Sequence, residues 1–148
     1  MSTTEQPCRR LVLGSTLAVG AATTLAACGD GSSAAPDNNP QAVPQPSGDP
    51  VTVADAADLP VGSMVNVARE GTKDAYLLYR QDEKTVLAYT SVCTHAGCRV
   101  GPGEGDFHCP CHDSHFSADD GTATAGPARG ALTRYAAEIS DGKILLYP

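Results

Sequence analysis

The residues best suited to chemistry lie in one short stretch of this 148-residue chain. Four of the six cysteines and all four histidines fall between Cys93 and His115. They form two groups, Cys93-Thr94-His95-Ala96-Gly97-Cys98 and Cys109-Pro110-Cys111-His112-Asp113-Ser114-His115-Phe116. Each group offers Cys and His plus one further Cys. A 2Fe–2S centre with two thiolates on one iron and two imidazoles on the other requires this inventory. The remaining two cysteines could then bridge the groups.

Other uses of the same residues are open. Two Cys and two His could hold a structural zinc ion. Zinc motifs usually pair like ligands, however, whereas each group here mixes Cys with His. Two plain disulfides would leave the histidines without a role. His108 and His115 exceed the two imidazoles that a cluster needs, and we expect them to have surface or loop roles.

The two groups together, CTHxGC followed by CPCHxSxF, resemble the binding motif of Rieske proteins, in the branch with a disulfide between the loops. The resemblance spans the chain from about residue 51 to the C-terminus. It implies four iron ligands, two cysteines on one iron and two histidines on the other: Cys93, Cys109, His95 and His112. It also implies a disulfide between Cys98 and Cys111. Ser114 is expected to donate to a cluster sulfide, and Gly126-Pro127-Ala128 resembles the loop that covers the cluster.

Three positions depart from the family pattern. Ala96 stands where cytochrome bc subunits typically have a Leu at the quinol-docking surface, which weakens the case for quinol oxidation. Asp113 replaces a Gly beside His112, and its carboxylate is expected to lower the potential of the cluster. Phe116 replaces a Tyr whose hydroxyl bonds a ligand sulfur, and hydrogen bonds to sulfur raise the potential. We therefore expect a potential below that of the high-potential relatives.

The N-terminal residues have the layout of an export signal. Arg9 and Arg10 precede an uncharged apolar stretch that ends in Leu25-Ala26-Ala27-Cys28, which resembles a lipobox. Residues 1–27 are therefore predicted to be a signal peptide, resembling the twin-arginine type, with Cys28 as the lipidated residue. An ordinary signal anchor is the alternative. The polar Gly-, Ser- and Pro-rich composition of residues 28–50 predicts a flexible linker. A disulfide also needs an oxidising compartment, which agrees with export.

After Pro50, short apolar alternations are broken by turn residues, which predicts strands at 51–53, 63–68, 75–80, 85–90, 132–139 and 143–147. The last two should form a hairpin through Ser140-Asp141-Gly142. Sustained helical periodicity is missing from this half. The prediction is one all-β domain over 51–148, with a long irregular insertion at about 91–129. The family resemblance makes it an antiparallel β-sandwich carrying an inserted cluster-binding subdomain.

The charge and the motifs limit the function. With 10 basic and 17 acidic side chains, the net charge of −7 argues against a nucleic-acid partner. The resemblance implies one-electron transfer at the outer face of the cytoplasmic membrane, as a respiratory-type iron–sulfur subunit or lipid-anchored carrier. Its partner would be a cytochrome or a membrane oxidoreductase. The small Rieske subunit of an exported oxidoreductase, such as arsenite oxidase, is the alternative. We expect no catalytic residue beyond the cluster ligands.

Overall fold

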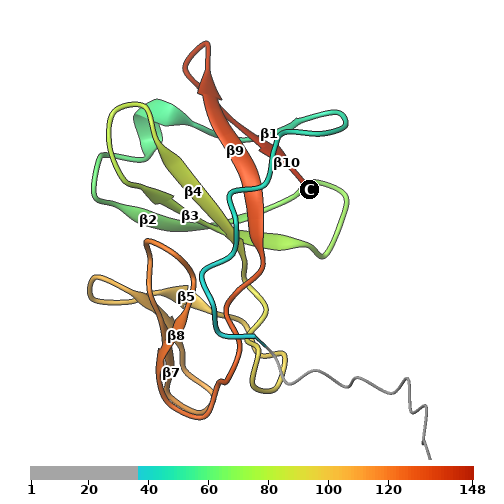
Figure 1. Ribbon diagram of the computed structural model, residues 1–148. Coiled ribbons are helices and arrows are strands. Elements are labelled where there is room, and N and C mark those ends of the chain that lie inside the picture. Colours follow the sequence, from blue (N-terminus) through green and yellow to red (C-terminus); the bar gives the residue numbers. More distant parts are fainter. Residues whose placement is uncertain (1–36) are drawn as a thin grey trace, which may run out of the picture. The chain divides into compact units, whose positions relative to one another are not determined.

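The computed structural model describes residues 37–148 (Figure 1). The predicted signal peptide (1–27), the predicted lipidation site Cys28 and linker residues 29–36 lie outside the described residues. The described part of the chain consists of strands, loops and one short 3-10 turn, η1 (Ala56–Asp58). None of its helical segments has the length and apolar character needed to cross a bilayer.

The larger of the two sheets of the domain has six antiparallel strands, in the order β1-β10-β9-β4-β3-β2. Its strands are β1 (Val51–Asp55), β2 (Met64–Ala68), β3 (Ala75–Arg80), β4 (Val86–Thr90), β9 (Arg134–Ser140) and β10 (Lys143–Tyr147). The sequence predicted all six to within about two residues, and the all-β class is confirmed. The sheet is joined between β4 and β9 at only two residue pairs, Ala88↔Tyr135 and Tyr89↔Arg134.

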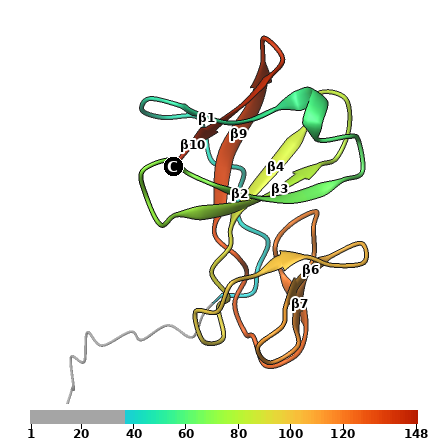
Figure 2. The same ribbon diagram turned by 180° about the vertical axis from the view of Figure 1, so that it is seen from behind.

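A second, four-stranded antiparallel sheet lies within residues 91–129, in the order β5-β6-β7-β8 (Figure 2). Its strands are β5 (Gly101–Pro102), β6 (Phe107–Cys109), β7 (Ser114–Phe116) and β8 (Ala123–Ala125). The prediction of an irregular insertion was therefore wrong in this respect. Strands of two or three residues are too short to show the alternation from which strands are predicted.

The two hairpins of the large sheet follow from their turn residues. Lys143 pairs with Ser140, so the β9–β10 loop is Asp141-Gly142, both with positive φ (48° and 74°). This is the Asp-Gly signal of a two-residue hairpin, because both central positions need the left-handed region. In the β3–β4 hairpin, the Asp82 carboxylate accepts the backbone N–H groups of Lys84 (2.7 Å) and Thr85 (2.8 Å).

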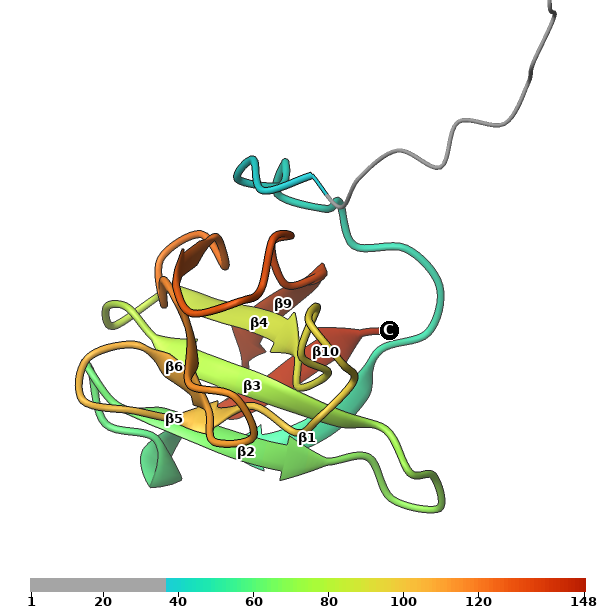
Figure 3. The same ribbon diagram turned by 90° about the horizontal axis from the view of Figure 1, so that it is seen from below.

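Strands β3 and β4 are buried on both faces, which explains their nearly continuous apolar sequences. Tyr76 and Leu78 pack into a core with Ile144 and Leu146 of β10. Alternate residues of the same strands face the other way and contact the second sheet and its loops. In Figure 3, β5 and β6 lie in front of the large sheet, and β5 contacts β2.

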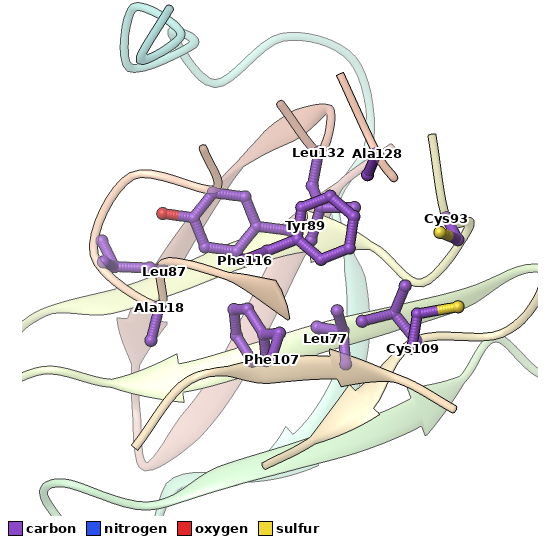
Figure 4. Packing of buried hydrophobic residues seen from close by; sticks show 11 residues of the cluster. Leu77, Leu87, Tyr89, Cys93, Phe107, Cys109, Phe116, Ala118, Ala128 and Leu132 are labelled. Atoms are coloured by element: carbon purple, nitrogen blue, oxygen red, sulfur yellow. The ribbon is translucent and has the colours of Figure 1, made fainter. Parts of the chain in front are cut away.

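The second core is therefore shared between the large sheet and the cluster-binding region (Figure 4). Its buried members are Leu77, Leu87, Tyr89, Cys93, Val100, Phe107, Cys109, Phe116, Ala118, Ala128 and Leu132. Because Cys93 and Cys109 belong to it, the floor of the predicted metal site is part of the hydrophobic core.

The described end of the predicted linker contacts the domain. Residues 37–50 have no regular structure and are mostly exposed. The Asn38 side chain donates to the Ala123 carbonyl (3.0 Å) and accepts the Ala123 N–H (2.6 Å). The Ala131 N–H donates to the Asp37 carbonyl, and the Arg134 N–H donates to the Gln41 side chain (3.1 and 3.0 Å). The linker is thus hydrogen-bonded to β8 and β9 over its first described residues.

Candidate metal centre

Two loops present the predicted ligands. The first follows β4 and turns tightly: the Cys93 N–H donates to the Cys98 carbonyl (2.8 Å), and the Gly97 N–H donates to the Cys93 carbonyl (2.9 Å). The second joins β6 to β7, where Cys109 pairs with Ser114 and four residues form the tip. Asp113, the last of these four, has φ of 58°. This is the left-handed region, which Asp tolerates better than most residues, so Asp can stand where the family pattern has Gly.

A disulfide between Cys98 and Cys111 joins the two loops, as the family resemblance implied. It leaves Cys93 and Cys109 as free cysteines within the described residues. The two are 3% and 1% exposed. Their thiols lie within hydrogen-bonding reach of each other.

The two histidines occupy the opposite, outer side of the loops. His95 and His112 are both exposed, and their ring centroids lie 4.7 Å apart with the planes nearly perpendicular. The site is thus divided into a buried thiol pair and an exposed imidazole pair. This division suits a two-iron centre with one kind of ligand on each iron.

The same arrangement tests the zinc alternative. A single zinc ion holds all of its ligand atoms about 2.0–2.3 Å away, so they must lie close to one another. Among residues 37–148, no three of the donor atoms of Cys93, Cys109, His95 and His112 lie within 4.8 Å of one another. The donor set therefore fits a centre with two metal ions better than one structural zinc.

Backbone groups stabilise the thiolate of Cys109. Burial, together with the neighbouring Cys93 thiol, raises the pKa of this thiol above its usual value, and the N–H groups of Cys111 and His112 offset part of this rise by donating to the sulfur. Hydrogen bonds to a thiolate favour the charged form that binds iron. The tip of the second loop therefore supplies N–H donors at the sulfur as well as ligand side chains.

A third loop closes the site, as the Gly-Pro-Ala resemblance anticipated. The Ala128 N–H donates to the hydroxyl oxygen of buried Ser114 (3.2 Å). A hydroxyl has one proton to donate besides its acceptor lone pairs, so the Ser114 proton remains free for a cluster sulfide. Gly126, with φ of 80°, packs directly against the backbone of Asp113 and Ser114. The Thr94 hydroxyl donates to the Gly130 carbonyl (2.7 Å), which ties the first loop to the third.

The departures from the family pattern have distinct positions. Ala96 is exposed beside His95. Phe116 is fully buried in the core that contains Cys93 and Cys109. The Asp113 carboxylate bonds the His108 ring (2.9 Å), and hydrogen bonds with His108 and then His115 lower its pKa. Its negative charge is thus directed at the imidazoles of β6 and β7.

The sequence did not anticipate where His108 and His115 lie. Both are half-buried and belong to strands β6 and β7, so their surface role is consistent with the structure and their loop role is wrong. In the structure each lies between two buried residues, Phe107-His108-Cys109 and Ser114-His115-Phe116, but three residues are too few for this alternation to be recognised in the sequence.

Fold and site together define a small antiparallel β domain with a two-loop, disulfide-linked cluster site. A protein-family model described as the Rieske [2Fe-2S] domain matches residues 49–136. The chain therefore belongs to the Rieske family, whose domain binds a 2Fe–2S cluster.

Known relatives agree with this assignment. The chain is 39% identical over 79 residues to a cytochrome b6-f complex iron-sulfur subunit of Gloeobacter violaceus, covering 51% of this chain and 42% of the relative. It is 31% identical over 74 residues to a menaquinol:cytochrome c reductase iron-sulfur subunit of Geobacillus thermodenitrificans, covering 47% and 44%. The matched segment thus spans less than half of either curated relative.

A solved structure matches over nearly its whole length. The crystal structure of a plasma membrane Rieske protein from the cyanobacterium Synechocystis PCC 6803 has a TM-score of 0.57 and 31% sequence identity. The match covers 66% of this chain and 99% of that one.

Proposed function

We propose that this protein transfers single electrons at the outer face of the cytoplasmic membrane, held there by a lipid on Cys28. The observation that carries the proposal is the division of the site into a buried thiol pair, Cys93 and Cys109, and an exposed imidazole pair, His95 and His112. When bound, a 2Fe–2S cluster supplies a one-electron couple. The four residues named here are its proposed ligands.

The chain's own residues determine from which side a partner can approach the site. Cys93 and Cys109 are buried in the hydrophobic core, where neither water nor a partner protein can reach them. His95 and His112 are exposed on the other side, so an approaching protein meets the imidazoles first. Neutral imidazoles in place of thiolates also make the site less negative, which favours accepting an electron at about −150 to +300 mV.

The relatives support a partner in a respiratory or photosynthetic chain. Their names place them in cytochrome b6-f and menaquinol:cytochrome c reductase complexes. We propose a cytochrome or a membrane oxidoreductase as the partner here. Ala96 offers little apolar surface beside His95, which favours an electron carrier over a quinol-oxidising subunit. The small subunit of an exported oxidoreductase, such as arsenite oxidase, is the alternative.

Ligand substitutions test the site. Protein purified after adequate iron supply should contain two irons and two acid-labile sulfides per chain. Cys93→Ser or His112→Gln should lose the cluster, whereas Lys84→Gln, on the distant β3–β4 turn, should keep it. Retention of the full iron and sulfide content by His112→Gln would refute the ligand assignment.

Membrane fractionation tests the anchor and the partner. Cys28→Ala should release the protein from the membrane or leave it unprocessed, because acylation needs that sulfur. A mature protein that begins elsewhere and carries no lipid would refute the anchor. Crosslinking in intact membranes should join the protein to a haem protein or a membrane oxidoreductase. Joining instead to a large soluble exported oxidoreductase would favour the alternative.

A further inference from the structure

The outer face of the β6–β7 hairpin carries a second group of metal-binding side chains. His108 of β6 pairs directly with His115 of β7. Their neighbours along each strand are buried, so alternation places the two imidazoles on the face opposite Cys109 and Phe116. The two rings stack at 4.6 Å between centroids. This face therefore presents two imidazoles that the cluster does not use.

Three donor atoms converge on this face. The Asp113 Oδ1 atom lies 2.9 Å from His108 Nε2 and 3.4 Å from His115 Nε2. One ligand atom from each of the three residues lies within 4.8 Å of the other two. With metal–ligand bonds of about 2.0–2.2 Å, neighbouring ligands of a tetrahedral ion lie about 3.3 Å apart. The observed separations are close to that spacing.

Asp106 completes the arrangement from behind. Its Oδ2 lies 2.7 Å from His115 Nδ1. A carboxylate that accepts the Nδ1 proton fixes the tautomer in which Nε2 is a free ligand, as in carboxylate–histidine–metal sites. Asp106 is itself held, because its side chain packs against Gly103 and its carbonyl accepts the Gly103 N–H (2.8 Å).

The group is open to solvent. The side chains of His108 and His115 are 33% and 32% exposed, and that of Asp113 is 84% exposed. His108 and His115 border a recess of about 380 Å³, which Gly103, Glu104 and Asp106 also line. An ion from solution can reach the three donor atoms without unfolding the hairpin.

We propose that His108, His115 and Asp113 bind one divalent transition-metal ion of the zinc type, with water in the remaining position. Asp106 is a positioning residue for His115. Two imidazoles and one carboxylate suit zinc and its neighbours, whereas magnesium and calcium prefer oxygen ligands. This site is separate from the proposed cluster ligands, and its test does not depend on electron transfer.

The test is zinc titration of the cluster-loaded protein by calorimetry, with iron content measured before and after. Wild type should bind one zinc per chain without losing iron. Zinc-edge X-ray absorption should show nitrogen and oxygen ligands at about 2.0–2.2 Å and no sulfur at about 2.3 Å. Sulfur ligands would mean that zinc occupies cysteines, and would overturn the proposal.

Variants assign the ligands. His108→Gln combined with His115→Gln should abolish the saturable binding. Asp106→Asn should weaken it by about 10–100-fold, the usual effect of losing an outer-shell partner. Asp113→Asn keeps a residue that tolerates the left-handed conformation and should also weaken binding. The matched control Asp58→Asn removes the same charge at an exposed site in η1 and should leave it unchanged.

Two results would refute the site. The first is a wild type that binds no zinc. The second is equal zinc affinity in wild type and the double histidine variant, with the cluster intact in both. Intact iron and sulfide content in every variant shows that the loops are folded, so a loss of zinc binding reports on the ligands themselves.

Discussion

Replacing Gly126 by Ala should open the metal site from the third loop. Gly126 has φ of 80°, and an added Cβ would press on the carbonyl oxygen of Asp113. It would also lie 2.6 Å from the Ser114 Cα and 2.8 Å from the Asp113 carbonyl carbon. These are backbone atoms, so no side chain can rotate to make room. The third loop must move away from the second.

Two costs add in this variant. The left-handed conformation costs an L-residue about 1–2 kcal/mol. Forcing a group into a filled space costs about 1–3 kcal/mol more. With about 4 °C lost per kcal/mol for a domain near 100 residues, the unfolding midpoint should fall by roughly 8–20 °C.

Gly142→Ala is the matched control, because Gly142 has φ of 74° and nothing within 4 Å of the added Cβ. It should lose only the conformational part, about 1–2 kcal/mol. The assay is thermal unfolding followed by circular dichroism and by the visible absorption of the cluster. Gly126→Ala should lose cluster absorption before the β signal, whereas Gly142→Ala should lose both together. Equal midpoints for the two variants would refute the close contact between the loops.

Other changes test separate parts of the domain. Replacing Cys98 and Cys111 together by Ser removes a crosslink between residues 13 apart, which should cost about 3 kcal/mol in the chain-entropy account and speed thermal loss of the cluster. Ser114→Ala removes the proposed sulfide donor, worth about 1.5 kcal/mol, and should lower the midpoint potential by about 60 mV. Phe116→Tyr should raise it if the new hydroxyl reaches a ligand sulfur. Asp82 has a pKa lowered from 3.8 by hydrogen bonds from Lys84 and Thr85, so its stabilisation is present above pH 3.8 and lost as the pH falls through the lower folded value. Asp82→Ala should therefore lower stability at pH 7 and remove that loss in acid.

Each of these has a control and a contrary outcome. Unchanged unfolding midpoints in the double Ser variant, measured against wild type with its disulfide intact, would contradict the crosslink argument. Ser117→Ala removes a hydroxyl outside the site and should leave the potential unchanged in redox titrations at fixed pH. A lower potential in Phe116→Tyr would show that the hydroxyl points away from sulfur. Asp82→Ala melts that still fall steeply below pH 3.8 would assign the acid loss to other carboxylates.

The sequence predicted the large sheet well because its strands carry alternating or continuous apolar residues between strong turn signals. The Asp141-Gly142 turn is the clearest case. The sequence could not predict the second sheet, because its strands are two or three residues long and are held by pairing with one another. The four proposed ligands and the disulfide pairing came from the resemblance of two short local motifs to the Rieske family. The His108–His115 pair depends on the β6–β7 register, which the spacing alone does not show.

The contacts of residues 37–41 were also not predictable, since they join polar side chains to backbone groups of distant strands. Asn38, for example, bonds to Ala123, 85 residues away. Composition describes how a segment behaves alone, and a polar, Pro-rich segment alone has little to bury. It does not report which unpaired N–H groups the rest of the domain offers.

Those contacts set how far the domain can travel from an anchor. If Cys28 carries the lipid as proposed, Asp37 lies nine positions and Val51 23 positions further along the chain. An extended chain spans at most about 3.6 Å per residue. The segment from Cys28 to Asp37 can therefore span about 32 Å when the contacts of residues 37–41 are intact, and the segment from Cys28 to Val51 about 83 Å when they are broken. While the hydrogen bonds of Asn38 and Gln41 are intact, the shorter segment limits how far the domain can move from the lipid surface. Breaking a few hydrogen bonds would bring taller partners within range.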